Sequence, residues 1–305
     1  RSACSRWTRM GTSAPEPTVT VGRCSTDSAL TADDLGRLSE GGDARPPHPA
    51  LTVELGQAEL QITGRLLQAS NATFLAELQV NGEPLECVYK PLEGERPLWD
   101  FPHRTLGLRE VAAYQVSRIG GFDCVPVTVL ADGPFGPGSL QVWVDVDEAA
   151  TDQLVDLVPS SAVPKHGWFA AVEGLDADDR PVSVIHADVA DLRLLAVFDV
   201  LINNADRKGG HILSSAGRVF GVDHGLSFHT DHKLRTLLWG WAGSELNLRE
   251  LAAVRKARDE APDQLGALLS DREIAALVHR ADVLLSRRRL PRPRGEWPSI
   301  PWPPF

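Results

Sequence analysis

The chain has 305 residues and a formal net charge of −10. That length suffices for one large domain or two lobes with a buried core. The acidic balance argues against a nucleic-acid partner, which usually requires a basic surface, and against unaided binding to an anionic membrane. No apolar run reaches the length of a membrane span and no signal-peptide core is present, so we expect a cytoplasmic protein without stable membrane insertion.

The four cysteines are far apart in the sequence and form no CxxC motif; they are Cys4, Cys24, Cys87 and Cys124. This pattern indicates unpaired thiols in a reducing compartment rather than a disulfide framework. The only methionine is Met10, which leaves open whether residues 1–9 are native.

The first half of the chain predicts a small antiparallel sheet with one helix. Residues 1–48 are rich in Ser, Thr, Pro and Gly, which is typical of a disordered leader. Short strand-like runs follow, and "VNGEP" between two of them predicts a hairpin. Apolar residues at helical spacing predict a helix over 106–119, ended by a glycine pair, and two further strands follow it. We therefore expect a small lobe over residues 49–147.

Residues 148–288 predict a second, mainly helical lobe. "ADVADLRLLAVFDVLINN" is apolar on a wide face, so we expect a buried helix with Asp188 as its N-cap. The segment "GRVFGVDHG" returns to strand and turn, and the tail 289–305 is too rich in proline for regular structure. Further helices are expected over 246–258, 262–270 and 271–287. The fold class is therefore α+β, with a sheet lobe followed by a helical lobe.

The stretch "NNADRKGGHILSSAGRVFGVDHG" carries the strongest chemical signal. In protein kinases a catalytic Asp is followed five positions later by a metal-binding Asn, and a second metal-binding acid follows the next strand. Here Asp206 is followed five positions later by His211, and Asp223 ends the strand "RVFGV". Lys208, two residues after Asp206, stands where a lysine can reach the transferring phosphate. We predict Asp206 and Lys208 as catalytic residues, with His211 and Asp223 as metal ligands.

A nucleotide needs donors for its phosphates, and the first half offers candidates for them. The loop "QASNATF" between the first two strands could supply backbone N–H groups and hydroxyls, although a polar turn is the simpler interpretation. Lys90 ends an apolar strand and could reach the phosphates, with Glu110 of the next helix as its ion-pair partner. The predicted nucleotide-binding residues on this side are Ser70, Asn71, Ala72, Thr73, Lys90 and Glu110.

"FDVLINNADRKGGHIL" followed by "GVDHGLSF" resembles the catalytic loop and metal motif of the phosphatidylinositol 3-/4-kinase superfamily, type II 4-kinases in particular. It is also similar to HipA-type bacterial kinases and secreted Fam20-type kinases, and most of all to phosphatidylinositol 3-/4-kinase-like proteins of actinobacteria. The resemblance covers about residues 55–245. It implies a two-lobed atypical kinase fold with ATP in the cleft and the site residues given above. It places the hinge that meets adenine at "QVWVD", with Trp143 and Val144.

The expected activity is transfer of the ATP γ-phosphoryl group to an acceptor hydroxyl, with Mn²⁺ or Mg²⁺ as cofactor. Position 211 is His where the resembling families usually have Asn, which favours Mn²⁺, because imidazole is a softer ligand than an amide oxygen. A protein acceptor is expected before a small metabolite or a lipid, because no basic, apolar surface segment is evident. Two alternatives stay open: nucleotidyl transfer in the same cleft, and a nucleotide-binding pseudokinase.

Three other patterns have simpler interpretations. A zinc site could use His224, His229 and His232 with Asp231, but an activation-like segment with Trp239 and Trp241 as packing or docking residues fits better. "LDADDRP", with Asp176, Asp178 and Asp179, resembles a calcium loop but favours a solvated turn. The tail could bind a partner, although packing of its prolines and tryptophans on the large lobe is preferred; its candidate residues are Arg287, Arg288, Arg289, Trp297 and Trp302.

Overall fold

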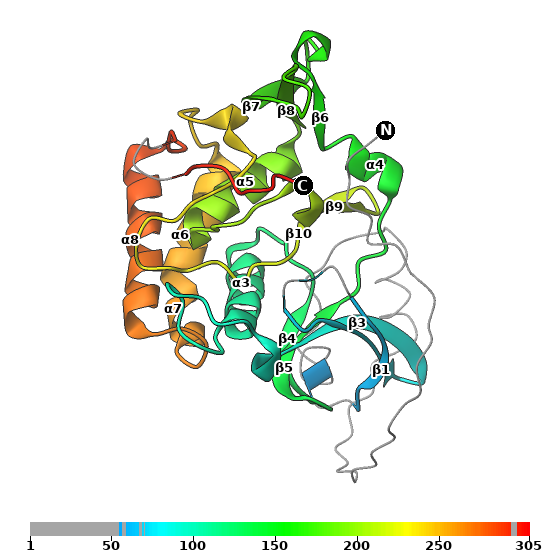
Figure 1. The fold of residues 1–305 in the computed structure, drawn as a ribbon. Coiled ribbons are helices and arrows are strands. Elements are labelled where there is room, and N and C mark those ends of the chain that lie inside the picture. Colours follow the sequence, from blue (N-terminus) through cyan, green and yellow to red (C-terminus); the bar gives the residue numbers. More distant parts are fainter. Residues whose placement is uncertain (1–54, 57–58, 67–68, 70, 294–297) are drawn as a thin grey trace. The chain divides into compact units, whose positions relative to one another are not determined.

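The computed structural model describes residues 55–56, 59–66, 69, 71–293 and 298–305 (Figure 1). The described chain contains antiparallel sheets and helices, which confirms the α+β class, and it divides into two compact units. We call the described residues between Leu55 and Gly107, together with Val127–Trp143, the sheet unit. Residues Leu108–Pro126 and Val144–Phe305 form the helical unit. The expected leader, 1–48, lies outside the described residues.

The sheet unit contains a five-stranded sheet in the order β1-β2-β3-β5-β4, with every neighbouring pair antiparallel. A 3-10 turn, η1 (Leu92–Gly94), follows β3. The strands are β1 (Gln61–Arg65), β2 (Phe74–Val80), β3 (Glu83–Pro91), β4 (Thr128–Gly133) and β5 (Gly136–Val142).

The predicted hairpin joins β2 to β3. Asn81 and Gly82 both have positive φ, 53° and 84°, and lie between the paired residues Val80 and Glu83. Such two-residue turns match the right-handed twist of the strands that they connect, and Asn-Gly adopts them at low cost. The prediction from "VNGEP" is therefore confirmed.

The helical unit holds most of the described helices, and the predicted helical regions are confirmed. The first two residues of α3 belong to the sheet unit and the rest to the helical unit. α7 ends at Leu265, several residues before its predicted end. The helices are α3 (Leu106–Gly120), α4 (Glu148–Asp152), α5 (Ala190–Ile202), α6 (Leu248–Glu260), α7 (Pro262–Leu265) and α8 (Asp271–Arg287); the 3-10 turns are η2 (Ser160–Ala162), η3 (Gly209–His211) and η4 (Trp239–Trp241).

Helix α5 is buried on nearly all sides, as its apolar sequence predicts. Its N-cap is Val189, without a side-chain cap, so the prediction that Asp188 caps it is wrong. The Asp188 carboxylate instead accepts a hydrogen bond from the indole N–H of Trp241, at 2.9 Å. A buried indole donor needs an acceptor, and here it takes the carboxylate that could have capped the helix.

A three-stranded antiparallel sheet in the helical unit was not predicted. Its order is β6-β8-β7, with β6 (Val155–Pro159), β7 (Trp168–Leu175) and β8 (Pro181–Ala187). β10 (Arg218–Gly221) is the expected return to strand, and it pairs with a strand that was not predicted, β9 (Ile212–Ser215).

The β7–β8 connection settles the nature of the acidic "LDADDRP" segment. Asp176 accepts hydrogen bonds from the backbone N–H groups of Asp178 and Arg180, both at 2.9 Å, and from the Arg180 guanidinium at 2.8 Å. Its oxygens therefore close a turn on the protein's own donors, as the solvated-turn interpretation predicts.

Cys87 and Cys124 are free and buried, which confirms the prediction for the two cysteines that the structure describes. Burial raises the pKa of the Cys124 thiol to about 12. Within the described part of the chain, no helix is long and apolar enough to cross a membrane.

His186 joins β8 to η4 in the core of the helical unit. It is fully buried, its ring centroid lies 4.4 Å from that of Trp241, and its Nε2 accepts the backbone N–H of Gly240 at 2.9 Å. Burial lowers the pKa of His186 to about 4. Protonation would remove the acceptor on which Gly240 depends, so the folded protein needs the neutral ring.

We predict a pH-dependent loss of stability that His186 causes. The folded pKa lies below the ordinary value of 6.5, so its contribution is complete above that pH and is lost as the pH falls toward 4. The full difference corresponds to about 3 kcal/mol of unfolding free energy. Urea unfolding at about pH 7.5 and about pH 4.5 should show a smaller loss for His186→Gln than for the wild type. Equal losses in the two proteins would contradict this account.

Candidate active site

The candidate site begins where α5 ends. Asn203 takes a left-handed conformation there, with φ 56° and ψ 50°. Its side-chain amide donates to the carbonyls of His229 and Asp231, at 2.9 and 2.7 Å, and its oxygen accepts the backbone N–H of Lys233 at 3.0 Å. A short amide side chain suits this position, because Asn tolerates positive φ and can satisfy several buried backbone groups. The chain therefore leaves α5 in a fixed direction.

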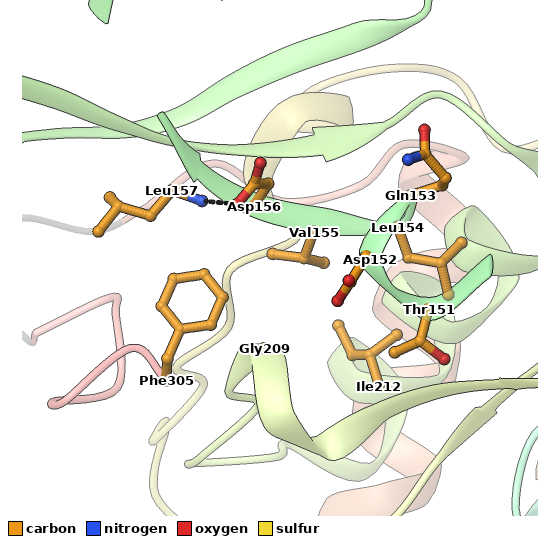
Figure 2. Close-up of a pocket in the computed structure, with 10 residues that line it drawn as sticks. All are labelled: Thr151, Asp152, Gln153, Leu154, Val155, Asp156, Leu157, Gly209, Ile212 and Phe305. Carbon is orange, nitrogen blue, oxygen red and sulfur yellow. Dashed lines mark hydrogen bonds between the residues drawn. The ribbon is translucent and has the colours of Figure 1, made fainter. Parts of the chain in front are cut away.

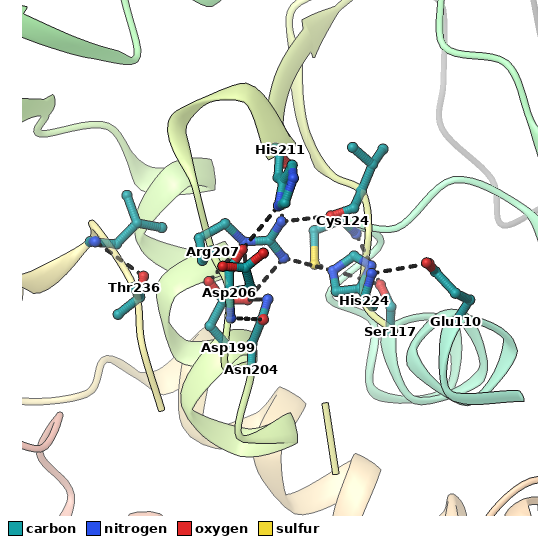
Figure 3. Close-up of polar contacts among 12 residues, drawn as sticks. Glu110, Ser117, Cys124, Asp199, Asn204, Asp206, Arg207, His211, His224 and Thr236 are labelled. Atoms are coloured by element: carbon teal, nitrogen blue, oxygen red, sulfur yellow. Dashed lines mark hydrogen bonds and ion pairs between the residues drawn. The ribbon is translucent and has the colours of Figure 1, made fainter. Parts of the chain in front are cut away.

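A buried ion pair lies beneath the loop that follows (Figure 3). Asp199 of α5 and Arg207 both have fully buried side chains, and they meet through two hydrogen bonds of 2.9 Å, one to each carboxylate oxygen. Asn204 donates to the same carboxylate at 2.9 Å and accepts the backbone N–H of Asp206, also at 2.9 Å. This network ties the backbone at the candidate catalytic acid to the core helix.

The Arg207 guanidinium also holds the segments that carry the two predicted metal ligands. Its Nη1 donates to the carbonyls of His211 and Val222, at 3.0 and 2.9 Å. Its Nη2 lies 2.7 Å from Nε2 of His224, which must accept because a guanidinium only donates. The planar group thus fixes the backbone beside both His211 and Asp223.

Asp206 and Lys208 lie together above this network. The Lys208 ammonium is 3.4 Å from a carboxylate oxygen of Asp206, and both side chains are largely but not fully buried. Burial raises the pKa of Asp206 to about 6, with Lys208 opposing the rise and the charge of Asp223 adding to it. A carboxylate with a pKa near neutrality can accept a proton and release it again.

His211 and Asp223 form the second pair. His211 Nδ1 is 2.9 Å from the carbonyl oxygen of Asp206, and its Nε2 is 3.4 Å from a carboxylate oxygen of Asp223. Burial lowers the pKa of His211 to about 4, so the ring is neutral at pH 7. A carbonyl oxygen cannot donate, which assigns the proton to Nδ1 and leaves the Nε2 lone pair facing the carboxylate.

Glu110 and Arg109 of α3 also reach this region. Glu110, predicted to hold Lys90, accepts the backbone N–H of His224 at 3.0 Å and so supports the turn after Asp223. Arg109 is buried, donates to the Ser227 carbonyl at 2.6 Å and pairs with Glu273 of α8. Both residues anchor the segment that follows the candidate metal ligand.

The structure does not gather the residues of the alternative zinc site. Among the described residues there is no group of three or more His, Cys, Asp or Glu that could hold a metal ion. The Nε2 of His224 is taken by Arg207, and Nδ1 of His229 accepts the backbone N–H of Asp231 at 2.9 Å. Trp239 and Trp241 are buried, which fits packing and not docking.

The predicted phosphate loop lies in the sheet unit, and part of it is already engaged there. The Ala72 N–H donates to the Gly94 carbonyl at 3.1 Å, the Asn71 side chain accepts the N–H of Arg96 at 2.9 Å, and Thr73 is buried. The Ala72 N–H is therefore engaged within the sheet unit, and the role of Asn71, Ala72 and Thr73 toward a phosphate stays a prediction. Ser70 lies outside the described residues.

Lys90 lies on β3 in register with Ser139 of β5, and it belongs to a different unit from Glu110. The division between the units falls between Trp143 and Val144, at the predicted hinge. The Trp143 N–H donates to the Glu86 carbonyl at 2.9 Å and so serves the sheet. The roles of Lys90, Trp143 and Val144 toward a nucleotide stay predictions.

The site is held by three residues that were not predicted as part of it: Asp199, Asn204 and Arg207. One signal was available, because Asp199 interrupts the apolar run "LRLLAVFDVLI" of a helix expected to be buried. A carboxylate in that place requires a buried cationic or hydrogen-bonding partner. Arg207 is one of the cationic residues nearest to Asp199 along the chain, and it lies on the loop that follows this helix.

No model of a known protein family matches the chain. The chain is 48% identical over 263 residues to Protein Rv2133c of Mycobacterium tuberculosis (strain ATCC 25618 / H37Rv). The match spans 82% of this chain and 94% of that protein, so nearly the full length of the relative has a counterpart here.

We predict that Arg207→Lys strongly destabilises the helical unit. A lysine ammonium cannot reach Asp199, His224 and the two carbonyls at once, so buried acceptors lose their partners. The free energy of unfolding in urea should fall by about 3 kcal/mol or more. Arg218→Lys is the matched control, because Arg218 donates at 2.6 Å to one carbonyl, that of Asp123, and is only partly buried. A change in Arg207→Lys no larger than that of the control would contradict the role assigned to Arg207.

Proposed function

Because this chain belongs to the same family as Protein Rv2133c of Mycobacterium tuberculosis, whose name states no activity, we propose a function from the chemistry of the site itself. The protein is a divalent-metal-dependent kinase that transfers the γ-phosphoryl group of ATP to an acceptor hydroxyl. The observation that carries the proposal is the pairing of Asp206 with Lys208 and of His211 with Asp223, each at 3.4 Å, on one clamped loop and turn.

Asp206 orients the acceptor hydroxyl and takes its proton. Its pKa of about 6 supports this role, because a base with a pKa near the working pH is both available and effective. Lys208 lies beside it and places a positive charge where negative charge on the transferring group would be stabilised.

His211 and Asp223 fit a divalent cation. An unprotonated Nε2 faces a carboxylate oxygen at 3.4 Å, and the other ring nitrogen donates to a backbone carbonyl, as in metal-binding histidines generally. Two protein ligands suffice in kinases, since substrate phosphates and water complete the shell. The bound cation would supply charge neutralisation for the phosphates.

The atypical kinase fold and the likeness to phosphatidylinositol 3-/4-kinase-like proteins are part of the same proposal. The sequence of buried helix, polar loop, two-stranded ribbon and acid-containing turn supports them. We propose that the acceptor is a protein, with a small metabolite as the second choice, and that the reaction with ATP takes place in the cytoplasm. This preference is based on the net charge of −10, which disfavours a lipid surface, and on analogy.

A labelling experiment tests the reaction. The full chain is incubated with Mn²⁺ and ATP that carries label in either the γ- or the α-phosphate, and label on the chain itself and in released phosphate is followed. We expect transfer from γ-labelled ATP alone, and Asp206→Asn and Asp223→Asn should each reduce it by about 10²-fold or more.

The matched control is Asp231→Asn. Asp231 is an exposed acid a few residues after Asp223, and its substitution should leave the rate within about twofold of the wild type. Transfer of α-label would establish nucleotidyl transfer in its place. Binding of ATP without transfer of either label would establish a pseudokinase and reject the kinase.

A separate prediction concerns which divalent metal ion supports the reaction. We expect a higher initial rate with Mn²⁺ than with Mg²⁺ across matched titrations, because an imidazole ligand favours the softer ion. His211→Asn should shift the preference toward Mg²⁺ by about tenfold in the ratio of rates. A wild-type rate with Mg²⁺ that equals or exceeds the rate with Mn²⁺ would reject the preference, while leaving the labelling result intact.

A further inference from the structure

We call the segment Ser299–Phe305 of the helical unit the strap (Figure 1, red), and it is hydrogen-bonded at both of its ends. The Ser299 carbonyl accepts two hydrogen bonds, from the N–H of Thr236 at 3.1 Å and from the indole N–H of Trp239 at 2.8 Å. At the other end, the Pro304 carbonyl accepts the N–H of Gly209 at 2.9 Å. Gly209 lies on the loop between Lys208 and His211, so the strap is bonded to the loop that carries the proposed chemistry.

Phe305 covers Gly209 closely. A Cβ atom placed on Gly209 would lie 2.3 Å from the Phe305 ring, so a side chain here would force the ring or the loop to shift. Gly209 does not have a positive φ, so the constraint comes from the ring and not from the backbone conformation. Figure 2 shows the Phe305 ring and Gly209 at a cavity of about 160 Å³ whose opposite wall includes Val155 and Leu157.

The Ser299 end of the strap reaches the same loop by a second route. Arg207 forms an isolated parallel bridge with Thr236, its N–H donates to the Arg235 carbonyl at 3.1 Å, and its carbonyl accepts the N–H of Leu237 at 3.3 Å. Thr236 lies between these residues and donates to the strap. The strap therefore holds the loop at Gly209 directly and at Arg207 through one intervening segment.

Trp302, in the middle of the strap, is 86% exposed, whereas Pro301 beside it is buried. The predicted packing of the tail is therefore met at Pro301, whereas Pro293, Pro298, Pro303 and Trp302 are exposed. This contrast provides a control residue, because Trp302 shares the segment and the aromatic character of Phe305 without touching the core.

We infer that Phe305 is a positioning residue for phosphoryl transfer. By packing on Gly209 it keeps the loop backbone in the geometry that aligns Asp206 and Lys208 with the acceptor. The inference depends on the proposed kinase activity for its effect on rate, but not for its effect on the loop. Small misplacements of catalytic groups reduce rates steeply, so the strap affects kcat while the KM for ATP stays nearly constant.

The test is a double-mutant cycle between Gly209→Ala and Phe305→Ala, with kcat and the KM for ATP measured from γ-label transfer. Each single variant should reduce kcat by about tenfold or more. Because the added methyl group acts only through the Phe305 ring, Gly209→Ala should have less than about a twofold effect in the Phe305→Ala background. Phe305→Leu, which retains an apolar contact, should recover part of the rate, and Trp302→Ala should match the wild type.

Equal effects of Gly209→Ala in both backgrounds would overturn the inference, and so would an unchanged or increased kcat in Phe305→Ala. A second measurement needs no turnover: hydrogen exchange at the Gly209 amide, whose N–H is bonded to Pro304, should accelerate by about tenfold in Phe305→Ala and not in Trp302→Ala. If the wild type transfers no label, the proposed function fails, and the exchange result alone then decides whether the strap orders the loop. Unchanged exchange would reject that role.

Discussion

The candidate site depends on the buried ion pair between Asp199 and Arg207. Removing two charges from water is costly, and the cost is offset only when every donor and acceptor finds a partner. Here Arg207 uses its guanidinium on Asp199, on two carbonyls and on His224. A hydrophobic pair could stabilise the core as well, but it could not fix the backbone on either side of a loop. The main role of the ion pair is therefore to fix the position of the loop backbone and not to add stability.

That geometry gives two nearby acids different roles, one structural and one proposed to be catalytic. Asp199 is held by Arg207 and Asn204 and is fully buried, so it has no access to a substrate. Asp206, seven residues later, projects from the clamped loop, and its pKa is raised toward neutrality by burial. The same chemical group thus anchors in one place and is available for proton transfer in the other. Asp199 accepts hydrogen bonds from Arg207 and Asn204, whereas Asp206 lies beside the ammonium of Lys208.

The sequence could predict what depends on local pattern. The spacing of Asp206, Lys208, His211 and Asp223 indicated a grouped set, and the structure brings them together as two pairs. Helix α5 and the Asn81–Gly82 turn likewise follow from apolar periodicity and turn chemistry.

Long-range partners could not be read in the same way. Strand β6 pairs with β8 across more than twenty residues, and β7 shows no strict alternation of buried and exposed positions that would mark it as a strand. Asp188 failed as a cap because an indole far along the chain competes for its carboxylate. The burial of Arg207 is also a tertiary property, since arginine is usually a surface residue.

The loop is short and glycine-rich, which by itself gives it little reason to hold one conformation. Its order comes from three partners outside the loop: Asp199 of α5, which pairs with Arg207, the 235–237 segment, and the strap against Gly209. Each comes from a different part of the chain, so the fold must be largely complete before the loop is fixed. Gly209 and Gly210 are then better explained by close packing than by flexibility, because both are buried. A loop that is rigid only through its surroundings can be tuned by changes far from its own sequence, and Phe305 is the most distant of those contacts along the chain.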